Sequence, residues 1–385
     1  MRRKRALFAL GLLQAFLALR VVRRLLHTAG GERIQPALSL NEAGEQCLAV
    51  IVPVLNEYDR LGPCLEGLLR QGDEVAEIIV VDGGSRDGTQ EMVIRYHVRD
   101  PRLRLLDASP IPVGWNGKSW GLHCALQQLA STADWVLTLD ADVRPGPVLA
   151  RSLLAHAQRT GLEALSVATL QEISGIGQAL LHPALLTTLV YRFGIPGRPL
   201  YRLEEVQANG QCFLVKRALL ERCGGFACTR ASLCEDVTLA RTLVAAGHAV
   251  GFYEAGGLVS VEMYRTWQEM WRNWTRSLPM HDRFSGSQTF LGWLEIALVQ
   301  ALPLPLCLAL ARVRRRVWPL LWLNGLCVAL RLGVLFGTAR AYRRRPWSYW
   351  LSPLCDLPVA FMLGSSALRR RHTWRGRVIL RGGLE

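Results

Sequence analysis

The chain lacks the short cysteine and histidine spacings that hold structural zinc. Its 10 cysteines are scattered over 385 residues, and Cys223 and Cys228 are too far apart for a CxxC pair. We therefore expect free thiols, in a reducing compartment or in lipid. Zinc-finger spacing and an aromatic RNA-binding signature are also missing, so we predict no nucleic-acid partner. No internal repeat is visible either, which argues against a solenoid or propeller.

Two glycine-rich nucleotide signatures are missing as well. The glycine-rich string Asp82-Gly83-Gly84-Ser85-Arg86-Asp87-Gly88-Thr89 is not GxGxxG, so a dinucleotide site is not expected. The string that ends in Gly117-Lys118-Ser119 is not a Walker A loop, because Pro112 stands where that motif needs its first glycine.

Apolar residues and positive charge, in contrast, are abundant. Half of the residues are hydrophobic, and the formal net charge is +15. Much of the basic excess flanks apolar runs, where it is attracted to anionic lipid headgroups. These clusters lie at residues 2–5, 20–24, 312–316, 343–345 and 369–371. We therefore predict membrane lipids as partners.

The apolar runs lie at the two ends of the chain. Residues 6–19 are short for a span, so we expect an N-terminal anchor or interfacial helix over residues 1–24, with a cleaved signal peptide as the alternative. A linker is expected over 25–46. Transmembrane or re-entrant helices are expected over 286–367, and a basic tail over 368–385. The expected location is the inner (cytoplasmic) membrane, multi-pass, with the catalytic domain facing the cytoplasm.

Three apolar runs make up the C-terminal part. Residues 290–311 and 317–338 are long enough to span a bilayer. Residues 347–367 contain Pro353, Asp356 and Pro358, so we expect that run to be re-entrant.

Residues 47–285 follow a strand–helix rhythm. Short, continuously apolar runs predict buried parallel strands, and longer runs with helical spacing lie between them. The expected strands are 47–54, 78–81, 103–106 and 135–139, and the expected helices are 57–69, 87–97, 119–130 and 238–246. This order predicts an α/β fold, with a mainly parallel sheet and helices on both faces. Ligands bind such sheets at the carboxyl ends of the strands.

Two carboxylates, Asp140 and Asp142, follow the last of these strands with one residue between them. A hard cation such as Mg²⁺ or Mn²⁺ takes one or two carboxylates and completes its shell with phosphate oxygens. We therefore predict a metal and diphosphate site at this strand end. A plain acidic turn is the alternative reading.

Earlier strand ends carry further polar residues. Asp82 opens the glycine-rich turn and can accept a hydrogen bond from a base or ribose, although the turn would also form as a simple helix cap. The strand that contains Pro53 ends at Asn56 and Glu57. Glu57 suits helix capping and nucleotide contact equally well.

Three later motifs also carry charge. Lys118 precedes a helix, where a cation and helix amides together favour phosphate. Glu235 and Asp236 begin another expected helix, and we choose Asp236 as the base that takes a proton from an acceptor hydroxyl. The segment from Trp271 to Trp274 contains Arg272, which could balance a departing diphosphate, while the two tryptophans could stack on a sugar or lie at the membrane interface.

Taken together, the ordered motifs resemble family 2 glycosyltransferases of the GT-A fold over roughly residues 47–280. The resemblance implies an inverting, single-displacement enzyme that uses a UDP- or GDP-sugar and Mg²⁺ or Mn²⁺. Its implied roles fall into four sets. The nucleotide-sugar residues are Pro53, Asn56, Glu57, Asp82, Lys118 and Asp140; the metal residues are Asp140 and Asp142; the acceptor or sugar residues are Asn209, Gly210, Gln211, Trp271 and Trp274; and the catalytic residues are Glu235, Asp236 and Arg272.

The string from Gly114 to Trp120 and the tail from Thr373 to Arg377 look similar to bacterial carotenoid- and hopanoid-associated glycosyltransferases. The QxxRW signature of processive polysaccharide synthases is not kept, because Trp271 stands three residues after Gln268. We therefore expect transfer to a hydroxyl of a lipophilic acceptor such as a carotenoid. The alternatives are a polysaccharide or lipid-linked sugar synthase, a catalytically silent membrane scaffold, and a nucleotidyltransferase.

Overall fold

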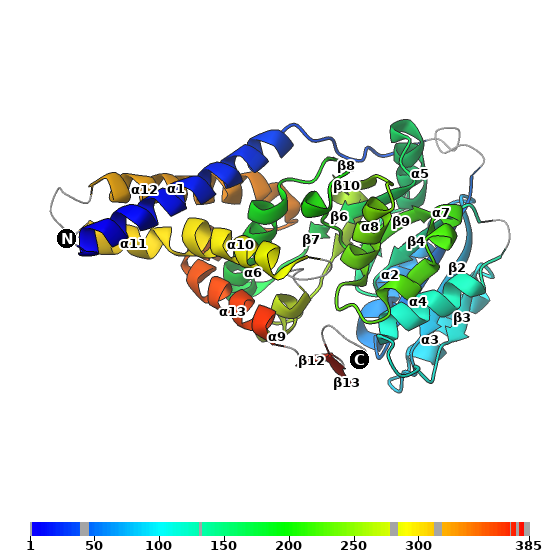
Figure 1. The fold of residues 1–385 in the computed structure, drawn as a ribbon. Helices are drawn as coiled ribbons and strands as arrows, with labels where there is room; N and C mark the ends of the chain where they lie inside the picture. The colour runs from blue at the N-terminus through cyan, green and yellow to red at the C-terminus, as the bar shows by residue number, and fades with distance from the viewer. Residues whose placement is uncertain are drawn as a thin grey trace. The chain divides into compact units, whose positions relative to one another are not determined.

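The computed structural model describes residues 2–38, 46–130, 133–277, 284–311, 318–369, 371–374 and 377–380. The chain forms two compact units, each built from three stretches of sequence (Figure 1). The sheet unit contains residues 31–172, 196–263 and 370–385, and the helical unit contains residues 1–30, 173–195 and 264–369. Residues 39–45 of the expected linker, the basic cluster at 312–316 and much of the expected basic tail lie outside the described residues.

An eight-stranded mixed sheet organises the sheet unit, in the order β3-β2-β1-β4-β9-β6-β10-β8. Strands β3, β2, β1 and β4 are mutually parallel, and so are β6 and β10, whereas β9 runs antiparallel to β4 and β6 and β8 runs antiparallel to β10. The bounds are β1 (Leu48–Val54), β2 (Val75–Asp82), β3 (Leu103–Asp107), β4 (Trp135–Leu139), β6 (Ala164–Ala168), β8 (Arg198–Leu200), β9 (Cys212–Lys216) and β10 (Val250–Glu254). The predicted α/β fold with a mainly parallel sheet is confirmed.

Both faces of this sheet are buried, which explains the continuous apolar runs in its strands. Alternate residues of β1 enter different cores: Val50 and Val52 pack on one side, and Ala49 and Ile51 on the other. One core is covered by α2 (Tyr58–Leu68), α3 (Thr89–Arg99) and α5 (Leu149–Thr160), and the other by α4 (Gly117–Gln127), α7 (Arg217–Arg222) and α8 (Glu235–Ala245). A smaller sheet pairs β5 (Val143–Pro145), β11 (Val259–Val261) and β7 (Leu170–Gln171) in the order β5-β11-β7.

The observed ends of the strands and helices predicted over residues 47–285 lie within three residues of the predicted ones. The strand 135–139 is found with the predicted bounds. Helix α3 begins at Thr89, two residues later than predicted; its N-cap is Gly88 in the left-handed conformation, and Asp87 Oδ1 accepts a hydrogen bond from the Thr89 backbone N–H at 3.1 Å. Asp87 Oδ2 also accepts from the Tyr58 backbone N–H at 3.0 Å, so this residue joins two helix starts.

Residues 31–38 lie along the sheet unit by means of specific hydrogen bonds. The Ile34 N–H donates to the Glu254 carbonyl at 3.0 Å, and the Glu32 N–H donates to the Gly197 carbonyl at 2.8 Å. The Ala37 N–H donates to Ser152 Oγ at 2.9 Å. This part of the expected linker is therefore ordered by pairing beside the end of β10.

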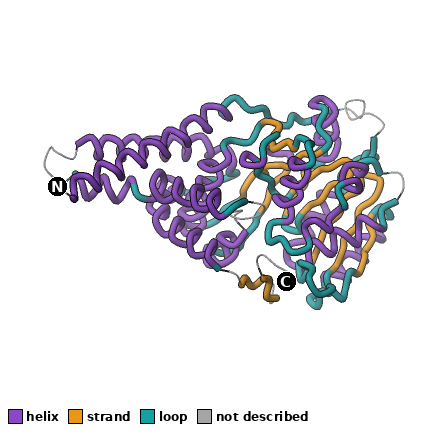
Figure 2. Tube along the Cα trace, in the orientation of Figure 1, coloured by secondary structure: helices purple, strands orange, loops and turns teal. Residues whose placement is uncertain are grey.

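Helices make up the described part of the helical unit, and they are drawn in purple in Figure 2. Their bounds are α1 (Arg2–Thr28), α6 (Gly175–Phe193), α9 (Trp267–Ser277), α10 (Gly286–Glu295), the π-helix η5 (Ile296–Ala301), α11 (Pro303–Leu310), α12 (Trp318–Thr338), the 3₁₀ helices η7 (Ala339–Ala341) and η8 (Trp347–Cys355), and α13 (Asp356–Leu368). Helix α6 has no counterpart among the predicted elements, and it places residues 173–195 in this unit.

Two helical stretches of the described residues are long and apolar enough to cross a membrane, Trp318–Ala341 and Trp347–Leu368. The run 290–311, expected to be long enough to span, lies in two helical segments, Gly286–Ala301 and Pro303–Leu310, which are bent by 42°. Proline lacks a backbone N–H and clashes with the preceding turn, so the helix changes direction at Pro303. The third run falls within Trp347–Leu368, which is long and apolar enough to span, and its re-entrant path stays a prediction.

Polar side chains join the helices of this unit through buried contacts. Gln14 of α1 donates to Asn324 Oδ1 of α12 at 2.9 Å and to the Leu298 carbonyl at 2.8 Å. Arg331 of α12 pairs with Asp356 of α13 at 2.8 Å, and both side chains are 3% exposed. Such contacts fix which helix faces which, because each polar group needs its partner in an apolar setting.

Candidate active site

The predicted metal motif lies at the carboxyl end of β4. Asp140 directly follows β4, and Asp142 directly precedes β5. The Asp140 N–H donates to the Gln211 carbonyl at 3.3 Å, which ties the predicted metal motif to the segment 209–211. The sheet pairing explains this contact, because β9 begins at Cys212 and lies antiparallel to β4.

Lys118 connects two acidic motifs that are far apart in the sequence. Its Nζ lies 2.5 Å from Asp140 Oδ1 and 2.5 Å from Glu235 Oε1. Burial opposes the positive charge, but the carboxylates of Asp140, Glu235 and Asp236 hold the pKa of Lys118 well above its ordinary value. Lys118 is therefore a charged link between the end of β4 and the start of α8.

A capping residue places Lys118 at this point. Asn116 is the N-cap of α4, and its side-chain oxygen accepts from the Lys118 N–H at 3.1 Å. Asn116 Nδ2 donates to the Ser232 carbonyl at 2.8 Å, and the Asn116 N–H donates to the Arg230 carbonyl at 2.6 Å. The first turn of α4 is thus tied to the loop that leads into Glu235.

Gly210 leaves the space in which the ion pairs form. A β-carbon at this position would lie 2.9 Å from Glu235 Oε1, 3.1 Å from Lys118 Nζ and 3.3 Å from Asp236 Cβ. The flanking side chains are held apart from this space, since Asn209 Nδ2 donates to Gln211 Oε1 at 2.9 Å. The predicted segment 209–211 therefore lies against the acidic cluster.

The four carboxylates of the cluster have different surroundings. Burial, followed by the charge of Glu235, raises the pKa of Asp236 to about 7. Burial, followed by the charges of Asp140 and Glu57, raises the pKa of Asp142 to about 8. Burial also raises the pKa of Asp140, and the charge of Lys118 partly offsets that rise. Asp142 Oδ1 is buried, and the described residues offer it no hydrogen-bond partner.

The residues predicted at the earlier strand ends form a second group. Asn56 adopts a left-handed conformation with φ of 55°, which asparagine tolerates, and its Oδ1 accepts from the Arg86 N–H at 2.9 Å. Glu57 is the N-cap of α2, but its side chain makes no capping hydrogen bond, while its charge acts on Asp142. Pro53 lies in β1 and pairs in register with Val81 of β2.

Asp82 is enclosed by its own turn. It is 0% exposed, and Oδ2 accepts from the Gly84 N–H at 3.1 Å, the Ser85 N–H at 2.9 Å and Gln90 Nε2 at 2.5 Å. Ser85 Oγ donates to Asp82 Oδ1. In this structure the carboxylate therefore shapes the glycine-rich turn, and its role toward a nucleotide stays a prediction.

The predicted aromatic and arginine residues lie on α9, which belongs to the helical unit. Trp274 is buried and packs on His182, with ring centroids 4.2 Å apart. Trp271 is half-buried and Arg272 is exposed. Their roles in binding and catalysis stay predictions.

Sequence reasoning missed two residues of the site. Arg60 lies in the first turn of α2, and its positive charge acts on Asp142. Its place just after the Asn56-Glu57 pair was the available signal. Asn116 lies within the string from Gly114 to Trp120 and was given no role, although an asparagine two residues before the lysine is a recognisable helix cap.

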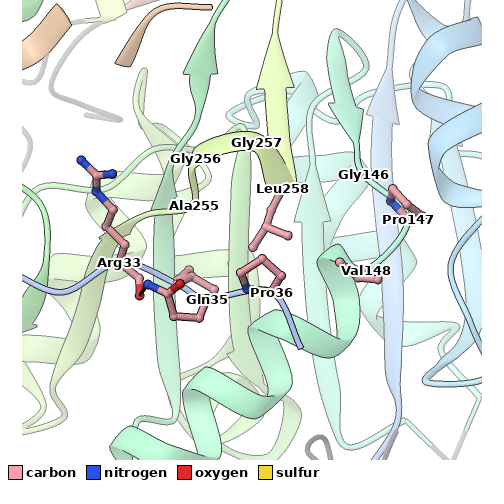
Figure 3. Close-up of a pocket in the computed structure, with 11 residues that line it drawn as sticks. Arg33, Gln35, Pro36, Gly146, Pro147, Val148, Ala255, Gly256, Gly257 and Leu258 are labelled. Atoms are coloured by element: carbon pink, nitrogen blue, oxygen red, sulfur yellow. Dashed lines mark hydrogen bonds between the residues drawn. The ribbon is translucent and has the colours of Figure 1, made fainter. Parts of the chain in front are cut away.

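A surface pocket of the sheet unit lies elsewhere in that unit (Figure 3). Three backbone segments line it, residues 33–36, 146–148 and 255–258. None of the predicted site residues is among its lining residues, so the acidic cluster and this pocket are separate features.

Comparison with known proteins matches part of the chain to a family. Residues 49–224 match the model of the family described as "Glycosyl transferase family 2". The chain thus contains a glycosyltransferase family 2 domain of the GT-A type, and the family that the sequence resembles is confirmed at this level. The more specific carotenoid- or hopanoid-associated subgroup stays a prediction.

Curated relatives are similar to only part of the chain. The succinoglycan biosynthesis protein ExoA of Rhizobium meliloti is 27% identical over 132 residues, which cover 34% of this chain and 38% of the relative. The undecaprenyl-phosphate 4-deoxy-4-formamido-L-arabinose transferase of Aeromonas hydrophila is 29% identical over 113 residues, covering 28% of this chain and 32% of the relative. The chain spans about a third of the length of these relatives.

A solved structure shares the fold over most of the chain. The mannosyltransferase PcManGT from Pyrobaculum calidifontis, solved in complex with GDP-Man and Mn²⁺, has a TM-score of 0.53 and 18% identity, and the match covers 91% of this chain and 97% of that one. At this identity, the likeness supports the fold.

Proposed function

We propose that the protein is an inverting glycosyltransferase that moves a sugar from a UDP- or GDP-sugar to a hydroxyl of a lipophilic acceptor at the cytoplasmic face of the inner membrane. The observation that carries the proposal is the convergence of Asp140, Asp142, Glu235 and Asp236 around Lys118 at the carboxyl end of β4. Open α/β sheets bind ligands at such strand ends. The related mannosyltransferase was solved with GDP-Man and Mn²⁺, which supports the same class of donor.

A divalent cation fits the residues present. Asp142 offers a buried carboxylate oxygen with no hydrogen-bond partner among the described residues, and Asp140 offers a second carboxylate. The described residues contain no group of three or more His, Cys, Asp or Glu side chains arranged to hold a metal alone. Mg²⁺ and Mn²⁺ accept such incomplete protein shells, because diphosphate oxygens and water complete them. When bound, the cation would supply charge neutralisation for the diphosphate.

Asp236 is the proposed base. Glu235 is held by Lys118 at 2.5 Å, so its carboxylate is already engaged, whereas the pKa of Asp236 is raised to about 7. In the proposed step the acceptor hydroxyl oxygen forms a bond to the anomeric carbon as the bond to the diphosphate oxygen breaks. The hydroxyl proton passes to the Asp236 carboxylate, which works best with a pKa near the working pH.

The acceptor is proposed to be a membrane-soluble molecule, and a carotenoid hydroxyl is our specific proposal. Two described helices are long and apolar enough to cross a bilayer, which supports a site next to lipid. The string from Gly114 to Trp120 supports the carotenoid class by its resemblance. Arg272, Trp271 and Trp274 of α9 are proposed to contact the leaving group and the sugar.

The test is donor turnover by the purified full chain in detergent, with UDP- and GDP-hexoses and Mn²⁺ or Mg²⁺. Asp142→Asn should lower turnover about a hundredfold or more, because the bound cation supplies several kcal/mol of charge stabilisation. Asp73→Asn, which changes an exposed aspartate of the same unit, should behave as wild type. Undiminished turnover by Asp142→Asn would remove the metal role. Failure of the wild type to bind any nucleotide-sugar would instead favour a silent scaffold.

A second function is favoured by the names of the relatives. One is a succinoglycan biosynthesis protein and another is an undecaprenyl-phosphate transferase, so a polysaccharide or lipid-linked sugar synthase is the alternative. Product length separates the two: a single sugar on a carotenoid supports our proposal, while a polymer or a sugar on a polyprenyl phosphate supports the alternative. Lipid and pigment profiles of a deletion strain would identify the acceptor directly.

A further inference from the structure

The ammonium group of Lys118 lies among the carboxylates of the acidic cluster. Its ammonium lies 2.5 Å from one oxygen of Asp140 and 2.5 Å from one oxygen of Glu235. Two strong charge-assisted contacts are therefore made by a single side chain. The side chain is 15% exposed, so the charge is poorly screened by water.

The carboxylates of the cluster differ in whether they have a partner. Asp140 and Glu235 each have the ammonium as a partner, but Asp142 Oδ1 is buried and makes no hydrogen bond within the described part of the chain. In the predicted metal pair, Asp140 Oδ1 is thus engaged by the Lys118 ammonium, whereas Asp142 Oδ1 has no partner among the described residues.

Gly210 leaves the space in which Lys118 contacts Asp140 and Glu235. A β-carbon there would come within 2.9 Å of Glu235 Oε1 and 3.1 Å of Lys118 Nζ. The absence of a side chain at position 210 therefore permits the ammonium to reach both carboxylates at once. The contact is a built feature of the fold, because the Asn116 cap holds the first turn of α4 beside the loop at Ser232.

We infer that Lys118 is a resident competing cation, which holds Asp140 in the donor-free protein and is released from it when a divalent cation arrives together with a nucleotide diphosphate. This inference rests on the proposed function, since it assigns a regulatory role to the same site. A lysine side chain suits the task because its ammonium is a compact charge on a flexible stem. Once released from Asp140, Lys118 stays near the diphosphate and gains oxygen contacts in exchange.

A consequence for binding follows from competition between the two cations. Mn²⁺ alone must displace Lys118 without any compensation, so it should bind weakly to the nucleotide-free protein. Mn²⁺ with a nucleoside diphosphate gives Lys118 new partners, so the two ligands should strengthen each other's binding. The coupling is reciprocal, and such couplings typically amount to about 5-fold to 150-fold in affinity.

The experiment measures Mn²⁺ binding to the full chain in detergent, by the loss of the free Mn²⁺ signal in electron paramagnetic resonance, with and without UDP or GDP. Lys118→Met should bind Mn²⁺ about tenfold more tightly than wild type in the absence of nucleotide, and the strengthening by UDP or GDP should shrink. Lys118→Arg, which keeps the charge, should retain weak binding of Mn²⁺ alone. Lys216→Met is the matched control, because Lys216 pairs with Glu163 on the same unit at a longer distance of 3.8 Å.

The outcomes separate this inference from the proposed function. If Lys118→Met binds Mn²⁺ no more tightly than wild type while UDP or GDP still promotes Mn²⁺ binding, the competing role is wrong and the metal-dependent function stands. If wild type and all variants fail to bind Mn²⁺ with either nucleotide, both proposals are wrong. Lys118→Gln, which keeps a hydrogen-bonding side chain, carries the same expectation should the methionine variant not fold.

Discussion

Gly210 lies so close to Lys118 that a β-carbon at position 210 would be 3.1 Å from the ammonium nitrogen. The same β-carbon would lie 2.9 Å from Glu235 Oε1, so the glycine leaves room for the ion pair of Lys118 and Glu235. Lys118 Nζ and Glu235 Oε1 are the ends of flexible side chains. A methyl group at position 210 should therefore displace the ion pair and leave the backbone in place.

The first prediction follows from this contact. Gly210→Ala should lower donor turnover by about tenfold to a hundredfold, since small misplacements of catalytic groups cost that much. Gly257→Ala is the control, because a β-carbon at Gly257 would have no neighbour within 4 Å. Turnover with a UDP- or GDP-sugar is the measurement, and thermal unfolding should be nearly unchanged. Wild-type turnover by Gly210→Ala would show that the ion pair tolerates displacement.

A second prediction concerns pH. The Asp236 pKa is raised to about 7, mainly by burial and next by Glu235. A base accepts a proton only when it is deprotonated, so the rate of transfer should rise as pH increases through about 7 and then level off. Asp236→Asn should lose about 10²-fold to 10⁴-fold in transfer rate while nucleotide binding is retained. A flat profile between pH 6 and pH 8 in wild type would contradict the assignment.

The third prediction concerns the stability of the sheet unit in acid. His156 is buried, its ring packs on Tyr253 at a centroid distance of 4.3 Å, and burial together with Arg159 lowers its pKa from 6.5 to about 4. The unfolded chain therefore binds a proton below pH 6.5 that the folded chain does not take up until about pH 4. The free energy of unfolding should fall as pH drops through this window.

Thermal unfolding of wild type and His156→Gln at pH 7.5 and pH 5.0 tests this expectation. The variant should be less stable at pH 7.5, because it loses the ring contact with Tyr253, but its melting temperature should change less between the two pH values. Equal pH dependence in the two proteins would show that other groups control acid stability.

The fourth prediction concerns the ion pair of the helical unit. Arg331 and Asp356 pair at 2.8 Å with 3% of each side chain exposed, and Gln300 Nε2 also donates to Asp356 at 2.8 Å. Removing one partner leaves a buried charge, so Arg331→Met and Asp356→Leu should each destabilise the protein by about 3–5 kcal/mol. The double variant should be more stable than either single one. Additive losses in unfolding experiments in detergent would contradict this coupling.

The sheet was largely predictable from sequence because its strands are buried on both faces. The run from Trp135 to Leu139 is apolar except for Thr138, and the structure gives the strand the same bounds. Strand β9 (Cys212–Lys216) was not predicted, and its antiparallel pairing with β4 depends on contacts distant in sequence. Pro303 could have indicated the bend within the run 290–311, but no bend was predicted there.

The sequence indicated which residues belong to the candidate site, but not which of them contact one another. Asp140, Glu235 and Lys118 each stood out by position relative to a strand or a helix. Their meeting at 2.5 Å depends on how α4 and α8 pack beside β4, and no spacing in the sequence encodes that distance. Asp82 differs from these residues. It also lies at a strand end, but its carboxylate accepts hydrogen bonds from the backbone of the turn that follows it.

The order of the two units along the chain has a practical consequence. Residues 173–195 belong to the helical unit, yet residues on either side of them belong to the sheet unit. Cutting the chain at one or both ends therefore cannot yield the sheet unit alone, because α6 would remain with its apolar partners gone. A water-soluble version of the sheet unit would need an internal excision that joins Glu172 to Pro196 through a new connection.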